Sequence, residues 1–75
     1  MKILVFGKLT DILRQSEQEL HGPETVAELR AALESSYPEL KNMRYLIAVD
    51  KKTANDQTTL TEQSEVALLP PFSGG

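Results

Sequence analysis

Short apolar runs separated by polar turns recur along this chain, and this pattern predicts a strand-rich fold. Runs of this length that are rich in β-branched and aromatic residues form strands more readily than helices. The segment 53–59 is polar, so we expect only a short edge strand within it. The other strands are expected at 2–6, 17–20, 45–49 and 66–69, and the one at 17–20 is weak.

Apolar residues after position 25 recur at helical spacing and predict the main helix. Thr25 and Glu28 form the T-x-x-E capping box that starts a helix. Tyr37 precedes Pro38, and a residue before proline avoids helical angles, so the helix ends there. A short turn of helix is also expected at 9–14. The stripe predicted to face the core is Val26, Leu29, Ala32 and Leu33, and the residues predicted to face water are Glu28, Arg30 and Glu34.

The order strand, strand, helix, strand, short strand, strand places the chain in the α+β class. If the first and last strands pair in parallel at the centre, the crossover between them carries the helix, as right-handed connections require. The segment 39–44 is too short for the second helix of a ferredoxin-like fold. We therefore expect a single β-grasp, ubiquitin-like domain over 1–75, with a mixed sheet and one main helix packed on one face. The predicted core is Ile3, Val5, Val26, Leu29, Leu33, Val66 and Leu68.

The same strands carry apolar residues at the alternate positions, which point to the opposite face of the sheet. One helix cannot cover both faces of the sheet. A face exposed to water would normally carry polar residues at these alternate positions, but here they are apolar. We therefore predict an exposed apolar patch that binds protein partners. The alternative is that the segment 8–14 covers part of it. The residues predicted to bind partners are Leu4, Phe6, Ala67, Leu69 and Phe72.

Composition narrows the classes of function. The net charge is −3 and the basic residues are scattered, which argues against a nucleic-acid binder and against an anionic membrane surface as partner. The sequence has no cysteine, which excludes disulfides, thiol nucleophiles and cysteine zinc sites. His21 is the single histidine, beside a probable turn, and we expect it at the surface. We expect no metal, no bound cofactor and no membrane segment, and a cytoplasmic location.

The carboxyl-terminal residues 70–75 form the most informative segment of the chain. The two prolines stiffen the exit from the last strand and cannot donate to a sheet ladder. The two terminal glycines leave a thin backbone that can enter a channel too narrow for other residues. Fully extended, the segment reaches roughly 20 Å. We expect a flexible tail with a reactive carboxylate at Gly75, and the alternative is an idle frayed end. The residues predicted to thread into a channel are Pro70, Pro71, Phe72, Ser73 and Gly74.

The segment 65–75, EVALLPPFSGG, closely resembles the terminus found in the MoaD/ThiS family of ubiquitin-like sulfur carriers, which includes the small subunits of molybdopterin synthase. The family pattern there is acidic-Val-Ala-apolar-apolar-Pro-Pro-apolar-Ser/Thr-Gly-Gly. The segments 2–7 and 48–50 also fit, so the resemblance spans the chain. Two positions depart from it: Thr10-Asp11 stands where the family often has Arg-Glu, and Asp50 where it often has asparagine.

The resemblance implies a function for Gly75. An adenylyltransferase similar to the ubiquitin-activating enzyme would use ATP to adenylate its carboxylate, and a sulfur donor protein would convert it to a thiocarboxylate. The larger subunit of molybdopterin synthase would then take this sulfur for a pterin precursor, in molybdenum cofactor biosynthesis. The chain would be the non-catalytic, sulfur-carrying subunit of that sulfurtransferase complex.

Three other functions share much of this pattern. A sulfur carrier of the thiamine pathway has the same fold and the same Gly-Gly end, although the Pro-Pro-x-Ser before the glycines argues against it. A ubiquitin-like modifier would instead form isopeptide bonds to lysines of target proteins. A β-grasp interaction module with an inert end would tolerate loss of Gly75.

Overall fold

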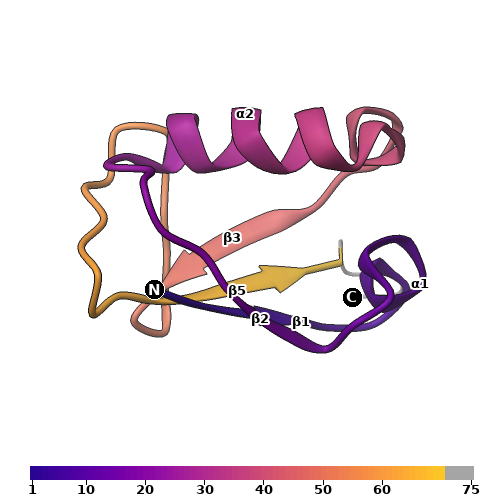
Figure 1. The fold of residues 1–75 in the computed structure, drawn as a ribbon, viewed down its shortest axis with the longest axis horizontal. Coiled ribbons are helices and arrows are strands. Elements are labelled where there is room, and N and C mark those ends of the chain that lie inside the picture. The colour runs from indigo at the N-terminus through magenta and orange to yellow at the C-terminus, as the bar shows by residue number, and fades with distance from the viewer. Residues whose placement is uncertain (71–75) are drawn as a thin grey trace.

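One mixed sheet runs through the computed structural model, which describes residues 1–70. Its strand order is β2-β1-β5-β3-β4 (Figure 1). The central pair β1 and β5 is parallel, and every other neighbouring pair is antiparallel. The predicted central pairing is thus confirmed. The strand bounds are β1 Lys2–Val5, β2 Glu17–Glu19, β3 Leu46–Val49, β4 Lys52–Thr53 and β5 Glu65–Leu69.

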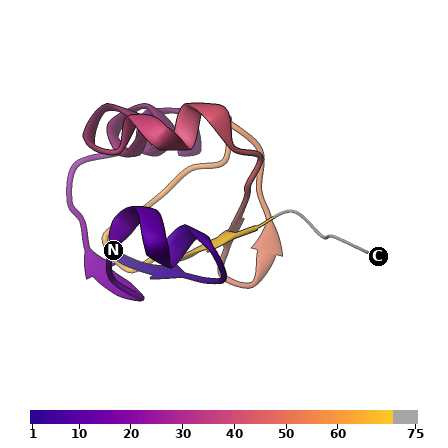
Figure 2. The same ribbon diagram turned by 90° about the vertical axis from the view of Figure 1, so that its right-hand side faces the viewer.

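The helices lie together on one face of this sheet. The long helix α2 (Val26–Ser36) crosses that face, and the short 3-10 helix η1 (Pro38–Asn42) follows it. The short helix α1 (Leu9–Leu13) lies on the same side of the sheet as α2 (Figure 2). This is the predicted arrangement of a mixed sheet with one main helix on one face.

The start of α2 follows the predicted capping box with one difference. The Thr25 hydroxyl accepts a hydrogen bond from the Glu28 backbone N–H at 3.3 Å, as expected for an N-cap. The Glu28 carboxylate accepts from the N–H of Glu24 at 2.8 Å, one residue before the cap, and not from Thr25 itself. The helix ends at Tyr37, whose φ of −131° lies outside the helical region, as expected for a residue before proline.

The core lies between the sheet and the helices. The seven predicted core residues are all buried, with exposed fractions of 3% or less. The prediction that Ala32 faces the core is wrong, because its side chain is exposed. At 3.6 residues per turn it lies about 100° around the helix from Leu33, which is too far to reach the sheet. Further apolar residues complete the core: Met1, Leu9, Leu13, Leu40, Tyr45, Ile47, Val49 and Leu60.

The edge strand is shorter and earlier than the sequence predicts. The segment 53–59 contributes only the end of β4 and an isolated bridge between Thr59 and Thr25. Asp50 and Lys51 have φ angles of 51° and 72°, the left-handed values of a two-residue hairpin turn. This tight turn brings the chain back into the sheet already at Lys52, one residue before the segment in which the edge strand was expected.

The prediction that Arg30 and Glu34 face water is wrong in part, because both side chains are half-buried. The cause is Tyr45, which is 8% exposed and lies beside α2. Its hydroxyl donates to Glu34 Oε2 at 2.8 Å, and its ring centroid lies 5.2 Å from the Arg30 guanidinium carbon. The two charged side chains therefore cover an aromatic core residue.

Candidate functional site

The sheet face opposite the helices carries a continuous apolar surface. Leu4 is the register partner of Ala67, and Ala67 of Ala48, so the three side chains share that face. Leu46 is the partner of Leu69 one row further along. Phe6 follows β1, and its N–H donates to the Leu68 carbonyl at 3.1 Å, which continues the parallel pairing. We call this surface the outer patch: Leu4, Phe6, Leu46, Ala48, Ala67 and Leu69.

The outer patch is open to solvent at its ends. Phe6 is 46% exposed and Leu46 is 40% exposed, and these two are the large exposed hydrophobic residues of the part of the chain that the structure describes. Leu4, Ala67 and Leu69 are half-buried between their neighbours, and the small side chain of Ala48 is buried. An exposed apolar surface of this kind typically marks a docking site.

The segment 8–14 does not cover this surface. Leu9 and Leu13 of α1 point into the core on the helix side, with exposed fractions of 0% and 3%. Figure 2 shows α1 on the same side of the sheet as α2, and Figure 1 shows it at one end of the sheet. The alternative that the sequence left open is therefore wrong, and the four strand residues predicted to face away from the helix do so. Their role in partner binding stays a prediction.

Leu46 and Ala48 are the members of the outer patch that the sequence analysis missed. The signal was present in the alternation of the predicted strand 45–49, where Ile47 and Val49 are the core-facing residues. What was lacking was the position of this strand beside β5, which brings its outer residues next to Ala67 and Leu69.

The predicted tail leaves the sheet beside the outer patch. Since β1 and β5 are parallel, both end at the same edge of the sheet, and Pro70 follows β5 there. A β-carbon on Gly7 would lie only 2.7 Å from Cγ of Pro70, so these two residues are in close contact. The other predicted tail residues, Pro71, Phe72, Ser73, Gly74 and Gly75, lie outside the described residues.

Within residues 1–70, no group of three or more His, Cys, Asp or Glu residues could hold a metal ion. His21 is exposed, as predicted, and its Nδ1 lies within hydrogen-bond distance of Glu62 Oε1. This hydrogen bond lowers the pKa of the Glu62 carboxyl. Both side chains of the pair are exposed at the surface.

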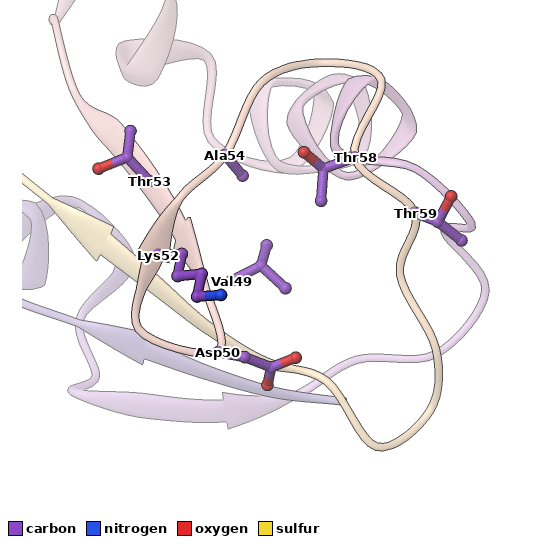
Figure 3. A pocket seen from close by; sticks show the side chains of 7 residues that line it. All are labelled: Val49, Asp50, Lys52, Thr53, Ala54, Thr58 and Thr59. Carbon is purple, nitrogen blue, oxygen red and sulfur yellow. The ribbon is translucent and has the colours of Figure 1, made fainter.

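A pocket of about 510 Å³ lies at the other end of the sheet (Figure 3). Its wall contains three threonines, and its charged residues are Asp50 and Lys52. Asp50 Oδ1 already accepts a hydrogen bond from the Glu65 N–H at 3.1 Å. Val49 in the pocket wall pairs with Val66 at the start of β5, whereas Pro70 follows the other end of that strand, and we assign the pocket no role in the chemistry of the tail. None of the described helices is long and apolar enough to cross a membrane.

A five-stranded mixed sheet with a parallel central pair and one long helix over a single face defines the β-grasp class of ubiquitin-like proteins. Within that class, the chain belongs to the ThiS family, which it matches over residues 3–75. It is 32% identical to the molybdopterin synthase sulfur carrier subunit of Caenorhabditis elegans, over 100% of this chain and 96% of that protein.

Solved structures agree with this assignment of the fold. A small protein of Pyrococcus furiosus is 19% identical and superposes with a TM-score of 0.86, covering 95% of each chain. Small archaeal modifier protein 1 of Methanosarcina acetivorans is 24% identical, with a TM-score of 0.81 over 99% of this chain and 94% of that one. A chain in the complex of subunits 1 and 2 of the molybdopterin-converting factor of Helicobacter pylori is 25% identical, with a TM-score of 0.70 and coverages of 99% and 96%.

Proposed function

We propose that this chain is the sulfur carrier subunit of a molybdopterin synthase. The observation that carries the proposal is the match to the ThiS family through residue 75, together with full-length identity of 32% to a curated sulfur carrier subunit. The chain ends in Gly74-Gly75, so its carboxylate lies on an unbranched backbone. The lack of cysteine leaves that carboxylate as the group able to hold transferable sulfur.

The chemistry at Gly75 needs activation from outside the chain. A terminal carboxyl group has a pKa near 3.5 and is ionised at neutral pH, so it is a poor electrophile. An adenylating partner would join the carboxylate to AMP from ATP and release pyrophosphate. A sulfur donor protein would then supply a hydrosulfide equivalent that attacks the acyl carbon and displaces AMP. The product is a thiocarboxylate, and delivery of its sulfur to a pterin precursor returns Gly75 to a carboxylate.

The outer patch supplies the docking surface in this scheme. It lies beside Pro70, so a partner that covers Phe6 and Leu69 is adjacent to the root of the tail. We propose that the larger synthase subunit and the adenylating enzyme each bind this surface, in turn. This part of the proposal is supported by the complex of subunits 1 and 2 from Helicobacter pylori, in which a chain of the same fold is joined to a second subunit.

The fold alone does not separate a sulfur carrier from a protein modifier, because the archaeal modifier protein superposes with a TM-score of 0.81, above the 0.70 of the chain from the molybdopterin-converting factor complex. The two functions differ in the fate of the tail, since a carrier ends in a thiocarboxylate and a modifier in an isopeptide bond. The sulfur carrier is favoured because the curated relative matched over the full chain is a sulfur carrier subunit.

The decisive experiment compares the full chain with a variant that lacks Gly75. Both are incubated with ATP, a matching adenylating enzyme and a sulfur source, and the intact mass is measured. We expect the full chain to exchange one oxygen for sulfur and the shortened chain to remain unmodified. Removal of Gly75 moves the carboxylate back by about 3.3 Å, which is too far for attack geometry in a site built for the longer tail.

Two controls make the result specific. Thermal unfolding of the two chains should be the same, since the deletion touches no core residue. The loaded chain should then support formation of the dithiolene product with the larger subunit. If the chain lacking Gly75 gains sulfur at the normal rate, the carrier mechanism is wrong. Adducts to lysines of other proteins, with no thiocarboxylate, would identify a modifier instead.

A further inference from the structure

Gly7 and Pro70 come into contact where the parallel strands β1 and β5 end. A β-carbon built on Gly7 would lie 2.7 Å from Cγ of Pro70, 3.4 Å from its Cδ and 3.5 Å from its Cβ. Real β-carbons essentially never approach another heavy atom within 3.0 Å, so Pro70 can occupy this position only because residue 7 has no side chain. Gly22 provides a contrast, because a β-carbon there would have no atom within 4 Å.

The proline ring can relieve such a clash only in part. A change of pucker moves Cγ, but Cδ and Cβ, at 3.4 Å and 3.5 Å, are bonded to the backbone and move only with the chain. A flexible side chain in the same place would simply rotate away. The contact therefore acts directly on the backbone of the last residue before the tail.

The turn that carries Gly7 is held in place on its other side. Gly7 has a φ of +61°, and its carbonyl accepts hydrogen bonds from the Thr10 hydroxyl at 2.7 Å and the Thr10 N–H at 3.1 Å. The helix that follows is anchored in the core by Leu9 and Leu13. Because the turn cannot retreat, a side chain at residue 7 would displace Pro70 and not the turn.

We propose that Gly7 is a positioning residue for sulfur transfer: its bare backbone seats the ring of Pro70 and so sets the direction in which the tail leaves the sheet. This proposal rests on the proposed function as a sulfur carrier. The carboxylate of Gly75 lies five residues beyond Pro70, up to about 16 Å away when extended. In a narrow channel of the larger subunit that holds the tail extended, a rotation of about 10° at Pro70 would move the end by about 3 Å. A misplacement of about 1 Å can already cost about 100-fold in rate.

The consequence is a separation of docking from delivery. Gly7 is not a member of the outer patch, so we expect the larger subunit to bind a chain substituted at Gly7 with the same affinity. The rate of sulfur transfer within the complex should fall, because the loaded carboxyl group arrives in the wrong place. A substitution that only weakens the fold would lower both the binding affinity and the transfer rate, or would change neither of them.

A double-mutant cycle over Gly7→Ala and Pro70→Ala tests the contact. Alanine at position 70 keeps the Cβ, which would lie 3.5 Å from the new β-carbon at ordinary contact distance, and it removes Cγ and Cδ. The backbone strain of alanine at a positive φ is the same in both backgrounds and cancels. With the thiocarboxylate-loaded carrier and saturating larger subunit, we expect Gly7→Ala to slow transfer at least about fivefold in the Pro70 background and less than about twofold in the Pro70→Ala background. Binding affinity should change less than about twofold.

Three further measurements keep the result interpretable. Gly22→Ala also places a β-carbon at a positive φ, of 117°, but without the contact, so a folded Gly22→Ala chain should transfer sulfur at an unchanged rate. Gly7→Asn tolerates a positive φ better than alanine and still adds a β-carbon, so it should slow transfer even if Gly7→Ala fails to fold. A nuclear Overhauser effect between the Gly7 α-protons and the Pro70 ring should be present in the free wild-type chain, whatever its function.

The proposal is overturned if Gly7→Ala and Gly7→Asn transfer sulfur at the wild-type rate, or if the loss is equal in both backgrounds. It is also overturned if no Overhauser effect joins the two residues. Failure of the proposed function gives a different result, because the wild-type chain itself would then neither accept nor deliver sulfur.

Discussion

Tyr45 contacts α2 through both its hydroxyl and its ring. The hydroxyl donates to Glu34 of α2, and the Arg30 guanidinium lies over the ring. Arg30 Nε in turn donates to Asp56 Oδ1 at 3.3 Å, which ties the loop after β4 to the same helix. Burial, and then the hydrogen bond to the Glu34 carboxylate, raise the pKa of Tyr45 to about 12 from the ordinary value of 10.0.

This shift predicts a pH dependence of stability. The folded state holds the Tyr45 proton more tightly than the unfolded state, so the stabilisation is fully present below pH 10 and is lost as pH rises from 10 to 12. Relative to Tyr45→Phe, which cannot ionise, the wild type should lose up to roughly 2–3 kcal/mol of unfolding free energy over that range. Urea unfolding at several pH values measures this, with Tyr37→Phe as the control. A constant difference between wild type and Tyr45→Phe from pH 9 to 12 would contradict the assignment.

Thr25 gives a second prediction at the level of a single residue. Its hydroxyl satisfies one of the free N–H groups at the start of α2. Thr25→Ala should lower the free energy of unfolding by about 1 kcal/mol, whereas Thr25→Ser, which keeps the hydroxyl, should cost much less. Denaturant midpoints of the two variants provide the comparison. Equal losses for the two variants would mean that the methyl group and not the cap is responsible.

At the scale of elements, β5 combines two roles in one strand. Val66 and Leu68 are fully buried under the helices, while Ala67 and Leu69 belong to the outer patch. The parallel pairing with β1 and the antiparallel pairing with β3 place this strand between them. A strand at this position can present a core face and a partner face because successive side chains point in opposite directions.

Neighbouring residues of β5 should therefore respond differently to the same truncation. Leu68→Ala should cost roughly 2–5 kcal/mol of unfolding free energy, because it opens a cavity in the core of a small domain. Leu69→Ala should change stability by less than about 1 kcal/mol but weaken binding to the larger subunit. Thermal unfolding and titration calorimetry measure the two effects. A loss of stability in Leu69→Ala as large as in Leu68→Ala would show that the outer face is not free.

At the scale of the whole molecule, the two faces of the sheet differ in how they are covered. The inner face is covered by the chain's own helices, and the outer patch is left uncovered within the described residues. Pro70 follows β5 at the edge of that patch, so a partner docked on the patch would lie next to the start of the tail. This arrangement suits a carrier that is handed between enzymes, because both can use the same surface.

Phe6→Asp tests that surface directly. A carboxylate buried in an apolar interface is costly, so affinity for the larger subunit should fall at least about tenfold. Ala32→Asp is the matched control, because it adds the same charge on the exposed side of α2 and should leave the affinity unchanged. Both variants should unfold near the wild-type temperature. Unchanged affinity of Phe6→Asp would exclude the outer patch as the docking surface.

The element positions were largely predictable because they depend on local patterns. The stripe of Val26, Leu29 and Leu33, the cap at Thr25 and the proline after Tyr37 act within a few residues, and the structure confirms all three. The errors arose at residues whose burial depends on side chains that are distant in sequence but close in space. Ala32 fits the apolar stripe by type but lies off the contact surface, and Arg30 and Glu34 are half-buried because Tyr45 lies beside them.

By itself, the sequence determined the order of the strands and helices, the β-grasp class and the resemblance of the terminal segment to that of sulfur carriers, because each of these depends on residues close together along the chain. Only the tertiary structure decided which surfaces those elements form together. Strand register placed Leu46 and Ala48 beside β5 and completed the outer patch. The parallel pairing of β1 with β5 brought Gly7 against Pro70. Such contacts join residues far apart in sequence, and their geometry depends on register and on the angles of intervening turns, which no local pattern specifies.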